Sequence, residues 1–342
     1  MTIRTALLAG AALALAAGTA AAQTPVTLKM ASFVPQASAT TRMFNQYVED
    51  VKTKSGGKLA LEIFHGASMG PLPRHYDLVR TGVADIAFFQ HGATPGRFPL
   101  TELTHLPYAF PDNFRGSLVA GQVAMDLVPE FFAKEHEDVH LIWIVYNRPS
   151  SVYDGAKPIA TLADMRGRRY RSPTTAVTEV MKAFGAVPVG VPATAMAESL
   201  QKGTLDGVVT DPIGIFSFRI GNLVKHETPM LTSVISFGLA MNKQAYSART
   251  PEERKIFDSW GGKDGAVRMI RTTWDDFPEF TDYMKSLGIQ QGRLTADADR
   301  EVRKLAEDYI ARAVTELDAK GQPAKAAWDR IKALSARYAA TN

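Results

Sequence analysis

The first hundred residues alternate between two hydrophobic periodicities, and this alternation leaves few folds open to the chain. Short runs with every second residue apolar predict β-strands over 26–31, 59–64 and 83–89. The first intervening segment repeats apolar residues every fourth position (Met43, Tyr47, Val51) and ends at Ser55-Gly56-Gly57, which predicts a helix. A second helix is predicted over 73–81. Strands that alternate with helices in this way form a parallel sheet covered by helices.

The same alternation returns in the middle of the chain and then gives way to a helical C-terminal region. Strands are predicted over 141–146, 168–172, 188–191 and 206–210, and helices over 174–184 and 193–202. Thr161-Leu162-Ala163-Asp164 resembles a capping box. Long helical stretches are predicted near 266–285, with a break or kink at Pro278, and near 296–338. A length of 342 residues allows two such α/β units.

The N-terminus has the pattern of a cleavable export signal. Arg4 precedes an apolar run from Ala6 to Ala17, and Ala20-Ala21-Ala22 supplies the small residues of a cleavage site before Gln23. A membrane anchor is the alternative, but the Ala and Gly content makes the run weakly hydrophobic and no charged flank follows it. We therefore predict that residues 1–22 are a signal peptide and that the mature protein is periplasmic.

Composition and charge exclude several kinds of site. The chain has no cysteine, which excludes disulfide frameworks, Cys-ligated zinc, iron–sulfur clusters and thiol catalysis. Nothing matches a dinucleotide-binding or Walker loop, so no cofactor is expected. The formal net charge is +4, and the only dense basic run is residues 166–171. Elsewhere basic and acidic residues alternate, so no nucleic-acid partner is expected.

Gly66-Ala67-Ser68-Met69-Gly70 matches the G-x-S-x-G pattern of a serine hydrolase. Only two predicted strands precede it, Pro71 and Pro73 obstruct the helix that should follow the serine, and no oxyanion segment of the HGGG type is present. We interpret the run as a Gly-rich turn and keep a secreted esterase that uses Ser68 as the alternative function.

Residues 135–140 gather side chains that can bind metals. Glu135, His136 and His140 lie within six residues, but they lack the H-E-x-x-H order. We interpret this run as a solvated loop and assign no metal site.

Arg171 is the strongest candidate for a binding residue. It ends a predicted strand and is followed by Ser172-Pro173 and a helix start. Ligands of open α/β sheets bind beyond the carboxyl ends of strands, where a guanidinium can hold a carboxylate by two parallel hydrogen bonds. An exposed arginine paired with a surface acid is the alternative.

Several segments in fixed order resemble the solute-binding proteins of TRAP transporters, the DctP family. The first are Ala84-Asp85-Ile86-Ala87-Phe88, Gly96-Arg97-Phe98-Pro99-Leu100 and Leu106-Pro107-Tyr108. The later ones are the run 163–171 around Met165-Arg166-Gly167, the run 195–207 that ends in Leu205-Asp206-Gly207, and Met241-Asn242-Lys243. The resemblance covers nearly all of the predicted mature chain.

This resemblance implies a two-lobed α/β periplasmic binding protein fold, type II-like, with the lobes joined by crossing strands and a long helix. We expect lobe I to comprise 23–148 and 238–276, and lobe II to comprise 149–237 and 277–342 with the C-terminal helices. The implied function is to capture a small organic carboxylate and deliver it to the small and large subunits of a membrane permease, without chemistry on the ligand. A module whose ligand triggers docking to a sensor remains a further alternative.

The resemblance also assigns binding roles to named residues. Arg171 stands where the family's arginine holds the ligand carboxylate. A second family arginine usually lies about twenty residues earlier, and the nearest arginine here is Arg148. Thr210 and Asp211 precede Pro212 where the family commonly has an Asn that contacts ligand.

Asp211 in place of the expected Asn bears on the class of ligand. A carboxylate there would repel a second acid group but accept a hydrogen bond from a hydroxyl or ammonium, which favours a monocarboxylate with a hydroxyl, keto or amino group over a dicarboxylate. The facing wall is expected at the ends of strands in the first lobe and near the crossing strand, from Phe33, Phe89, Gln90, His91 and Phe237.

Overall fold

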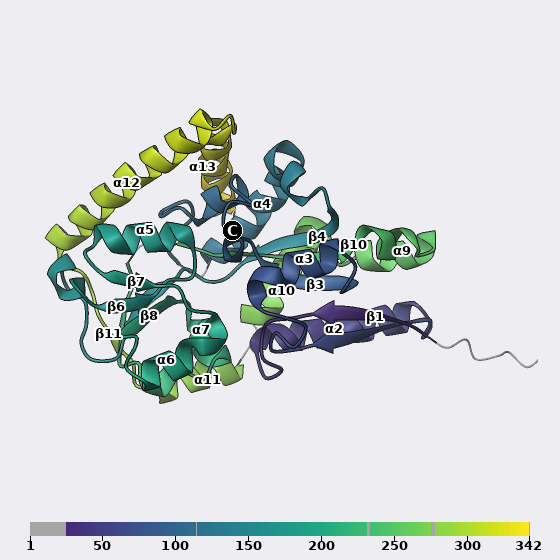
Figure 1. Cartoon of the computed structure of the whole chain (residues 1–342), viewed down its shortest axis with the longest axis horizontal. Coiled ribbons are helices and arrows are strands. Elements are labelled where there is room, and N and C mark those ends of the chain that lie inside the picture. Colours follow the sequence, from purple (N-terminus) through teal and green to yellow (C-terminus); the bar gives the residue numbers. More distant parts are fainter. Residues whose placement is uncertain (1–24, 114, 231–232, 275–277, 342) are drawn as a thin grey trace, which may run out of the picture.

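The computed structural model describes residues 25–113, 115–230, 233–274 and 278–341, and the predicted leader lies outside these ranges. Two separate mixed β-sheets divide the molecule into two α/β lobes (Figure 1). The chain enters the second sheet after residue 146 and returns to the first at residue 236. The predicted two-lobed α/β class is therefore confirmed.

The sheet of lobe I has the strand order β2-β1-β3-β10-β4. The three N-terminal strands are parallel, and β10 is antiparallel to both of its neighbours. The strands are β1 (Val26–Ala31), β2 (Leu59–Phe64), β3 (Ile86–Gln90), β4 (Val139–Tyr146) and β10 (Ser236–Asn242).

Helices cover both faces of this first sheet. On one face, α2 (Ala39–Lys54) and α10 (Gly262–Trp274) pack into the largest apolar cluster with Met30 and Phe88. On the other face, α3 (His75–Arg80) packs against Phe89 and α4 (Arg115–Leu127) against Tyr146. The short helices α8 (Lys243–Ser247) and α9 (Pro251–Asp258) follow β10.

The sheet of lobe II has the order β11-β9-β5-β8-β6-β7. The strands are β5 (Ser151–Asp154), β6 (Arg169–Arg171), β7 (Val187–Val189), β8 (Gly207–Thr210), β9 (His226–Thr228) and β11 (Gln290–Gln291). Its two faces are covered by α5 (Thr175–Ala183) with α12 (Ala296–Ala319), and by α6 (Met196–Gln201), α7 (Pro212–Ser217) and α11 (Pro278–Ser286).

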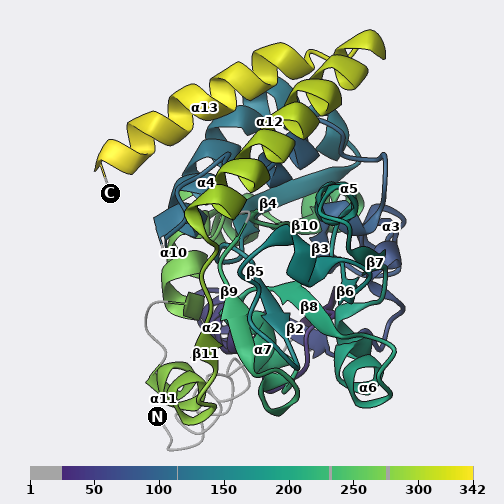
Figure 2. The same cartoon turned by 90° about the vertical axis from the view of Figure 1, so that its left-hand side faces the viewer.

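Two chain segments and one long helix join the lobes. Residues 147–150 run beside the returning segment, because Asn147 N donates to Ile235 O at 3.2 Å and Ser150 N donates to Ser233 O at 3.0 Å. Helix α12 packs on α5 in lobe II and continues into α13 (Ala324–Thr341), which crosses α4 of lobe I (Figure 2). The lobe boundaries that we expected from the resemblance stay a prediction.

Local signals in the sequence explain where several elements begin and end. The Ser38 side chain accepts from Thr41 N and starts α2, and Thr174 does the same for α5 through Val177 N. Gly185, at φ +77°, follows the end of α5 in a conformation that favours glycine. The capping box at Thr161 is present, on a 3₁₀ turn.

The expected strands all form, with shifted ends in places. β3 starts at Ile86 rather than at residue 83, because residues 81–85 form a turn after α3. The helical stretch predicted near 266–285, with a break or kink at Pro278, is two helices, with α10 ending at residue 274 and α11 starting at Pro278.

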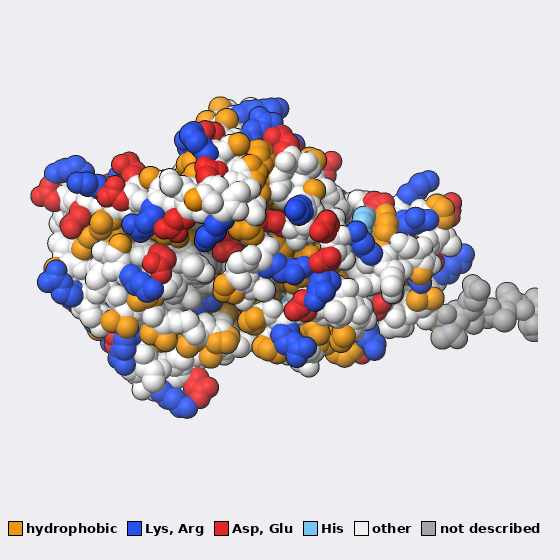
Figure 3. Space-filling model, turned by 45° about the horizontal axis from the view of Figure 1, so that its top comes forward, with side chains coloured by type: hydrophobic (Ala, Val, Ile, Leu, Met, Phe, Trp, Pro, Cys, Tyr) orange, Lys and Arg blue, Asp and Glu red, His pale blue; other side chains and the backbone are white. Residues whose placement is uncertain are grey.

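The surface carries both signs of charge. On the face in Figure 3, Lys and Arg side chains are interspersed with Asp and Glu and form no continuous basic stripe. Within the described part of the chain, no helix combines the length and apolar character needed to cross a bilayer.

Candidate ligand-binding site

A cavity of about 70 Å³ lies between the lobes, beyond the carboxyl ends of strands from both sheets. Lobe I contributes apolar side chains after β1 and on β3, β4 and β10, and lobe II contributes residues that follow β8. The lining residues are Phe33, Val34, Thr40, Phe88, Val145, Asn147, Asp211, Ile213, Gly214, Ser217, Phe218, Phe237 and Met269. This edge of a sheet is where α/β proteins bind ligands.

Three phenylalanines of lobe I form one wall of the cavity. The rings of Phe33 and Phe88 are stacked with centroids 5.1 Å apart and planes 7° apart, and Phe237 stacks beside them at 6.0 and 5.4 Å. Phe33 and Phe237 were predicted for this wall, whereas Phe88 was not. Stacked flat faces of this kind suit a planar apolar group.

Asp211 and Asn147 connect the lobes at the polar side of the cavity. Asp211 Oδ1 accepts from the backbone N of Ile213 and Gly214 at 2.8 and 3.2 Å, which caps α7, and Oδ2 accepts from Asn147 Nδ2 at 2.8 Å. Asn147 Oδ1 accepts from Ile235 N at 2.6 Å, so its amide nitrogen must face Asp211. Burial raises the pKa of Asp211, and these hydrogen bonds counteract part of that rise.

Arg171 is a buried cation on lobe II, only 6% exposed. Its Nε donates to Val191 O at 3.3 Å and its Nη1 to Val209 O at 3.4 Å, both long for hydrogen bonds. No ion pair of Arg171 occurs among the residues that the structure describes. Burial lowers its pKa to about 10, and the charge of Asp211 acts in the opposite direction. The alternative of a surface arginine paired with an exposed acid does not fit this burial.

Arg148 and Thr210 lie around the same edge without lining the cavity. The Arg148 guanidinium carbon is 5.6 Å from the centroid of the Phe280 ring, and its charge favours the ionised form of Asp211. Thr210 is 5% exposed, and its Oγ1 lies so close to Gly214 that a Cβ built there would be 2.3 Å away. A role of either residue in ligand binding stays a prediction.

Gln90, Phe89 and His91 follow one another along the chain but face different surroundings. Gln90 Nε2 donates to Pro173 O at 3.1 Å, which ties the end of β3 to lobe II. Phe89 packs with Tyr76 on the face of the sheet opposite Phe88, and His91 Nε2 is 2.9 Å from His136 Nε2. Their predicted contact with ligand is untested, and none of the three lines the cavity.

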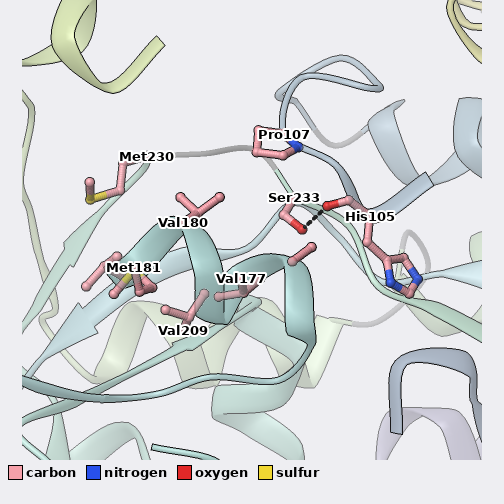
Figure 4. A pocket seen from close by; sticks show the side chains of 10 residues that line it. His105, Pro107, Val177, Val180, Met181, Val209, Met230 and Ser233 are labelled. Carbon is pink, nitrogen blue, oxygen red and sulfur yellow. Dashed lines mark hydrogen bonds between the residues drawn. The ribbon is translucent and has the colours of Figure 1, made fainter. Parts of the chain in front are cut away.

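A second, smaller pocket lies beneath α5 (Figure 4). Val177, Val180 and Met181 of α5 face Val209 on β8, and the other wall is the segment with His105 and Pro107. It encloses about 10 Å³, about the space that one water molecule needs. Ser233 Oγ donates to His105 O at 2.8 Å on the same side, and we regard the pocket as a packing gap.

The Ser68 turn does not assemble a catalytic site in the described residues. Ser68 is exposed in a turn where its backbone N donates to His65 O at 3.1 Å, and its hydroxyl contacts no described histidine or carboxylate. This geometry is that of a Gly-rich turn.

The interpretation of residues 135–140 as a solvated loop was wrong for Glu135 and His136, whereas Glu137 and Asp138 are exposed in a turn. Glu135 accepts from the backbone N of Leu100 at 2.6 Å and of Thr101 at 3.0 Å, and His136 is 3% exposed. His140 points elsewhere, with Nε2 3.2 Å from Asp258 Oδ1. The polar run therefore anchors the 100–101 segment. Within the described ranges, no group of three His, Asp or Glu residues could hold a metal ion.

Comparison with known families decides the classification. Residues 30–316 match the model of the family described as bacterial extracellular solute-binding protein, family 7 (DctP). The chain belongs to this family. The relatives in it are substrate-binding receptors and not enzymes, so the esterase alternative is not supported. A solute-binding protein of Verminephrobacter eiseniae is 25% identical over 261 residues, which are 75% of this chain and 76% of the relative.

Solved structures share the whole fold. A TRAP solute-binding protein from Rhodoferax ferrireducens, solved with copurified benzoate, has a TM-score of 0.86 and 25% identity, covering 92% of this chain and 99% of that one. A marine metagenome TRAP solute-binding protein specific for aromatic acids, solved with 3-hydroxybenzoate, has a TM-score of 0.85, 27% identity and the same coverage. The expected TRAP binding-protein class is confirmed.

Sequence reasoning missed several lining residues. Asn147 directly follows a predicted strand, so the carboxyl-end rule that selected Arg171 also applied to it. Thr40 and Ser217 carried no such signal, because each lies in a helix whose contact with the cavity depends on how the two lobes meet.

Proposed function

We propose that this protein binds an aromatic monocarboxylate between its two lobes in the periplasm and delivers it to the membrane subunits of a TRAP permease. The observation that carries the proposal is that Arg171 is buried without an ion pair in the described structure. It does not itself line the aromatic-walled cavity, but the charge of the lining residue Asp211 acts on it. Cleavage of residues 1–22 and hinge closure of the lobes over the ligand belong to the same proposal.

Arg171 supports recognition of a carboxylate. A guanidinium stays protonated at neutral pH even with a pKa of about 10, and it can donate two parallel hydrogen bonds to one carboxylate. Its present acceptors are two backbone carbonyl oxygens at long distance. A carboxylate oxygen of the ligand in their place would form stronger, charge-assisted hydrogen bonds. Burial without a carboxylate partner is unfavourable, so an anionic ligand offers the missing compensation.

Asp211 supports one carboxylate and not two. Its carboxyl group lines the cavity and its Asn147 partner holds it in place, so a second anionic group beside it would be repelled. The stacked phenylalanines support a ring as the remainder of the ligand. Benzoate and 3-hydroxybenzoate, the ligands named for two structural neighbours, have this combination of one acid group and one ring.

Isothermal titration calorimetry with three small molecules tests the proposed class. Benzoate should bind, benzamide should not because it lacks the charge, and succinate should not because it carries a second acid group. Binding of succinate in preference to benzoate would contradict the proposal.

Uptake measurements test delivery to the permease. Cells that lack this protein should lose uptake of labelled benzoate at low concentration, and the unmodified gene should restore it while Arg171→Ala should not. Uptake that persists without the protein would contradict its role in transport.

A further inference from the structure

The cavity is mostly apolar, and its few polar side chains fall into two pairs. Thr40, Asn147, Asp211 and Ser217 are the polar side chains in the lining. Asn147 and Asp211 are bonded to each other, to Ile235 N and to the α7 N-terminus. Their hydrogen-bonding capacity is therefore largely used within the protein.

Thr40 and Ser217 differ from this pair. Thr40 is 8% exposed and Ser217 is 9% exposed, yet neither hydroxyl makes a hydrogen bond to another residue in the described part of the chain. Neither hydroxyl oxygen is among the fully buried side-chain atoms that lack a partner in the described chain, so each keeps some accessible surface at the cavity, where a ligand group can bond to it. Ser38, and not Thr40, caps α2, so the Thr40 hydroxyl has no role in starting its helix.

The two hydroxyls come from opposite lobes. Thr40 lies in the first turn of α2 in lobe I, and Ser217 lies at the last position of α7 in lobe II. A polar group of a ligand within reach of both would be held from each side and would favour contact of the lobes. Each hydroxyl can donate and accept, so together they can satisfy a group that does both.

We infer that Thr40 and Ser217 recognise a hydroxyl substituent on the ring of the ligand, which makes the substrate class a hydroxylated aromatic monocarboxylate. This inference rests on the proposed function and narrows it. A hydroxyl fits better than a charged substituent because the surrounding lining is Phe33, Phe88, Ile213 and Met269, which would disfavour a buried charge. A second carboxylate is further disfavoured by Asp211.

The test compares benzoate with its 3-hydroxy and 4-hydroxy derivatives by calorimetry. The unmodified protein should bind at least one hydroxybenzoate about tenfold more tightly than benzoate, the factor expected for a hydrogen bond of about 1.4 kcal/mol. Equal affinity for all three would overturn the inference and leave the proposed function standing. Failure of all three to bind would overturn both.

Variants then locate the recognition. Thr40→Val and Ser217→Ala should each weaken the preferred hydroxybenzoate about tenfold and change benzoate affinity by no more than about twofold. Thr40→Ser, which keeps the hydroxyl, should retain the preference, and Thr315→Val on the exposed face of α12 is the matched control. If Thr40→Val does not fold, as judged by circular dichroism, Thr40→Ala replaces it.

Two results with the variants would contradict the inference. Equal losses for benzoate and the hydroxybenzoate would indicate a packing role. An unchanged preference in both variants, with loss only in Asp211→Asn, would place the ligand hydroxyl at Asp211.

Discussion

Replacing Arg171 with methionine should have opposite effects on stability and on binding. The side chain is 6% exposed and donates only to two carbonyl oxygens, at 3.3 and 3.4 Å. Burial lowers its pKa well below the ordinary value of arginine, to about 10, which corresponds to about 3 kcal/mol against the charged form. Methionine has a similar length and no charge. Arg171→Met should therefore stabilise the ligand-free protein by about 1–3 kcal/mol, because it removes the buried charge.

The same substitution should abolish ligand binding. Loss of two charge-assisted hydrogen bonds to a carboxylate costs about 3 kcal/mol or more, which lowers affinity more than a hundredfold. Urea unfolding without ligand gives the first quantity and calorimetry with the best-bound aromatic acid gives the second. Most mutations that abolish binding also destabilise the fold, so a gain in stability is a distinctive result.

Arg168 provides the matched control because it is an arginine of the same region with a partner. Its Nη2 is 2.6 Å from Asp154 Oδ2, and the Asp154 side chain is 1% exposed. Arg168→Met should destabilise the protein by about 3 kcal/mol, because it leaves a buried carboxylate without its cation, and should preserve affinity. Destabilisation of the ligand-free protein by Arg171→Met, or retained affinity, would refute the reasoning.

Three further predictions follow from other contacts. Asp211→Asn should lower thermal stability, because the new amide NH₂ would face the Nδ2 donor of Asn147. It should also reduce the difference in affinity between benzoate and a dicarboxylate, because the repelling charge is removed. A larger difference would contradict the role of the charge. Gly92→Val should weaken ligand binding about tenfold in calorimetry, with little change in the circular dichroism spectrum. The reason is that a Cβ at Gly92 would lie 2.8 Å from Thr174 Cγ2 on the other lobe. Unchanged affinity would show that the lobes need not be in contact there. Burial lowers the pKa of His105 to about 3, below the ordinary value of 6.5, so the unfolded chain takes up a proton first as the pH falls. Its stabilising contribution is complete above pH 6.5 and is lost toward pH 3, by about 2 kcal/mol at pH 5. His105→Gln should therefore reduce the difference in unfolding free energy between pH 7 and pH 5 by about that amount, and an unchanged difference would contradict the burial argument.

Much of the fold could be predicted because its signals are local. The strands over 26–31 and 59–64 form as expected, because apolar residues recur at alternate positions and give each strand one apolar face. Helix α5 begins after Thr174 and ends before Gly185 because the capping hydroxyl and the positive φ are properties of those residues. The split near Pro278 follows from the missing backbone donor of proline.

The candidate site was harder to predict from the sequence, because it depends on which face of the sheet each strand residue points to and on how the two lobes contact each other. Phe88 and Phe89 have the same chemistry, and only the pleat of β3 decides that Phe88 faces the cavity and Phe89 the opposite side. His136 is a polar residue and would be expected at the surface from sequence alone, yet it is buried against His91, which is distant along the chain.

A crystal structure with the best-bound aromatic acid is the most direct test of the central claim. The account predicts that both carboxylate oxygens lie about 2.7–2.9 Å from the Arg171 guanidinium nitrogens, with the ring against Phe33 and Phe237. A ligand bound elsewhere, with Arg171 making no contact to it, would contradict the account.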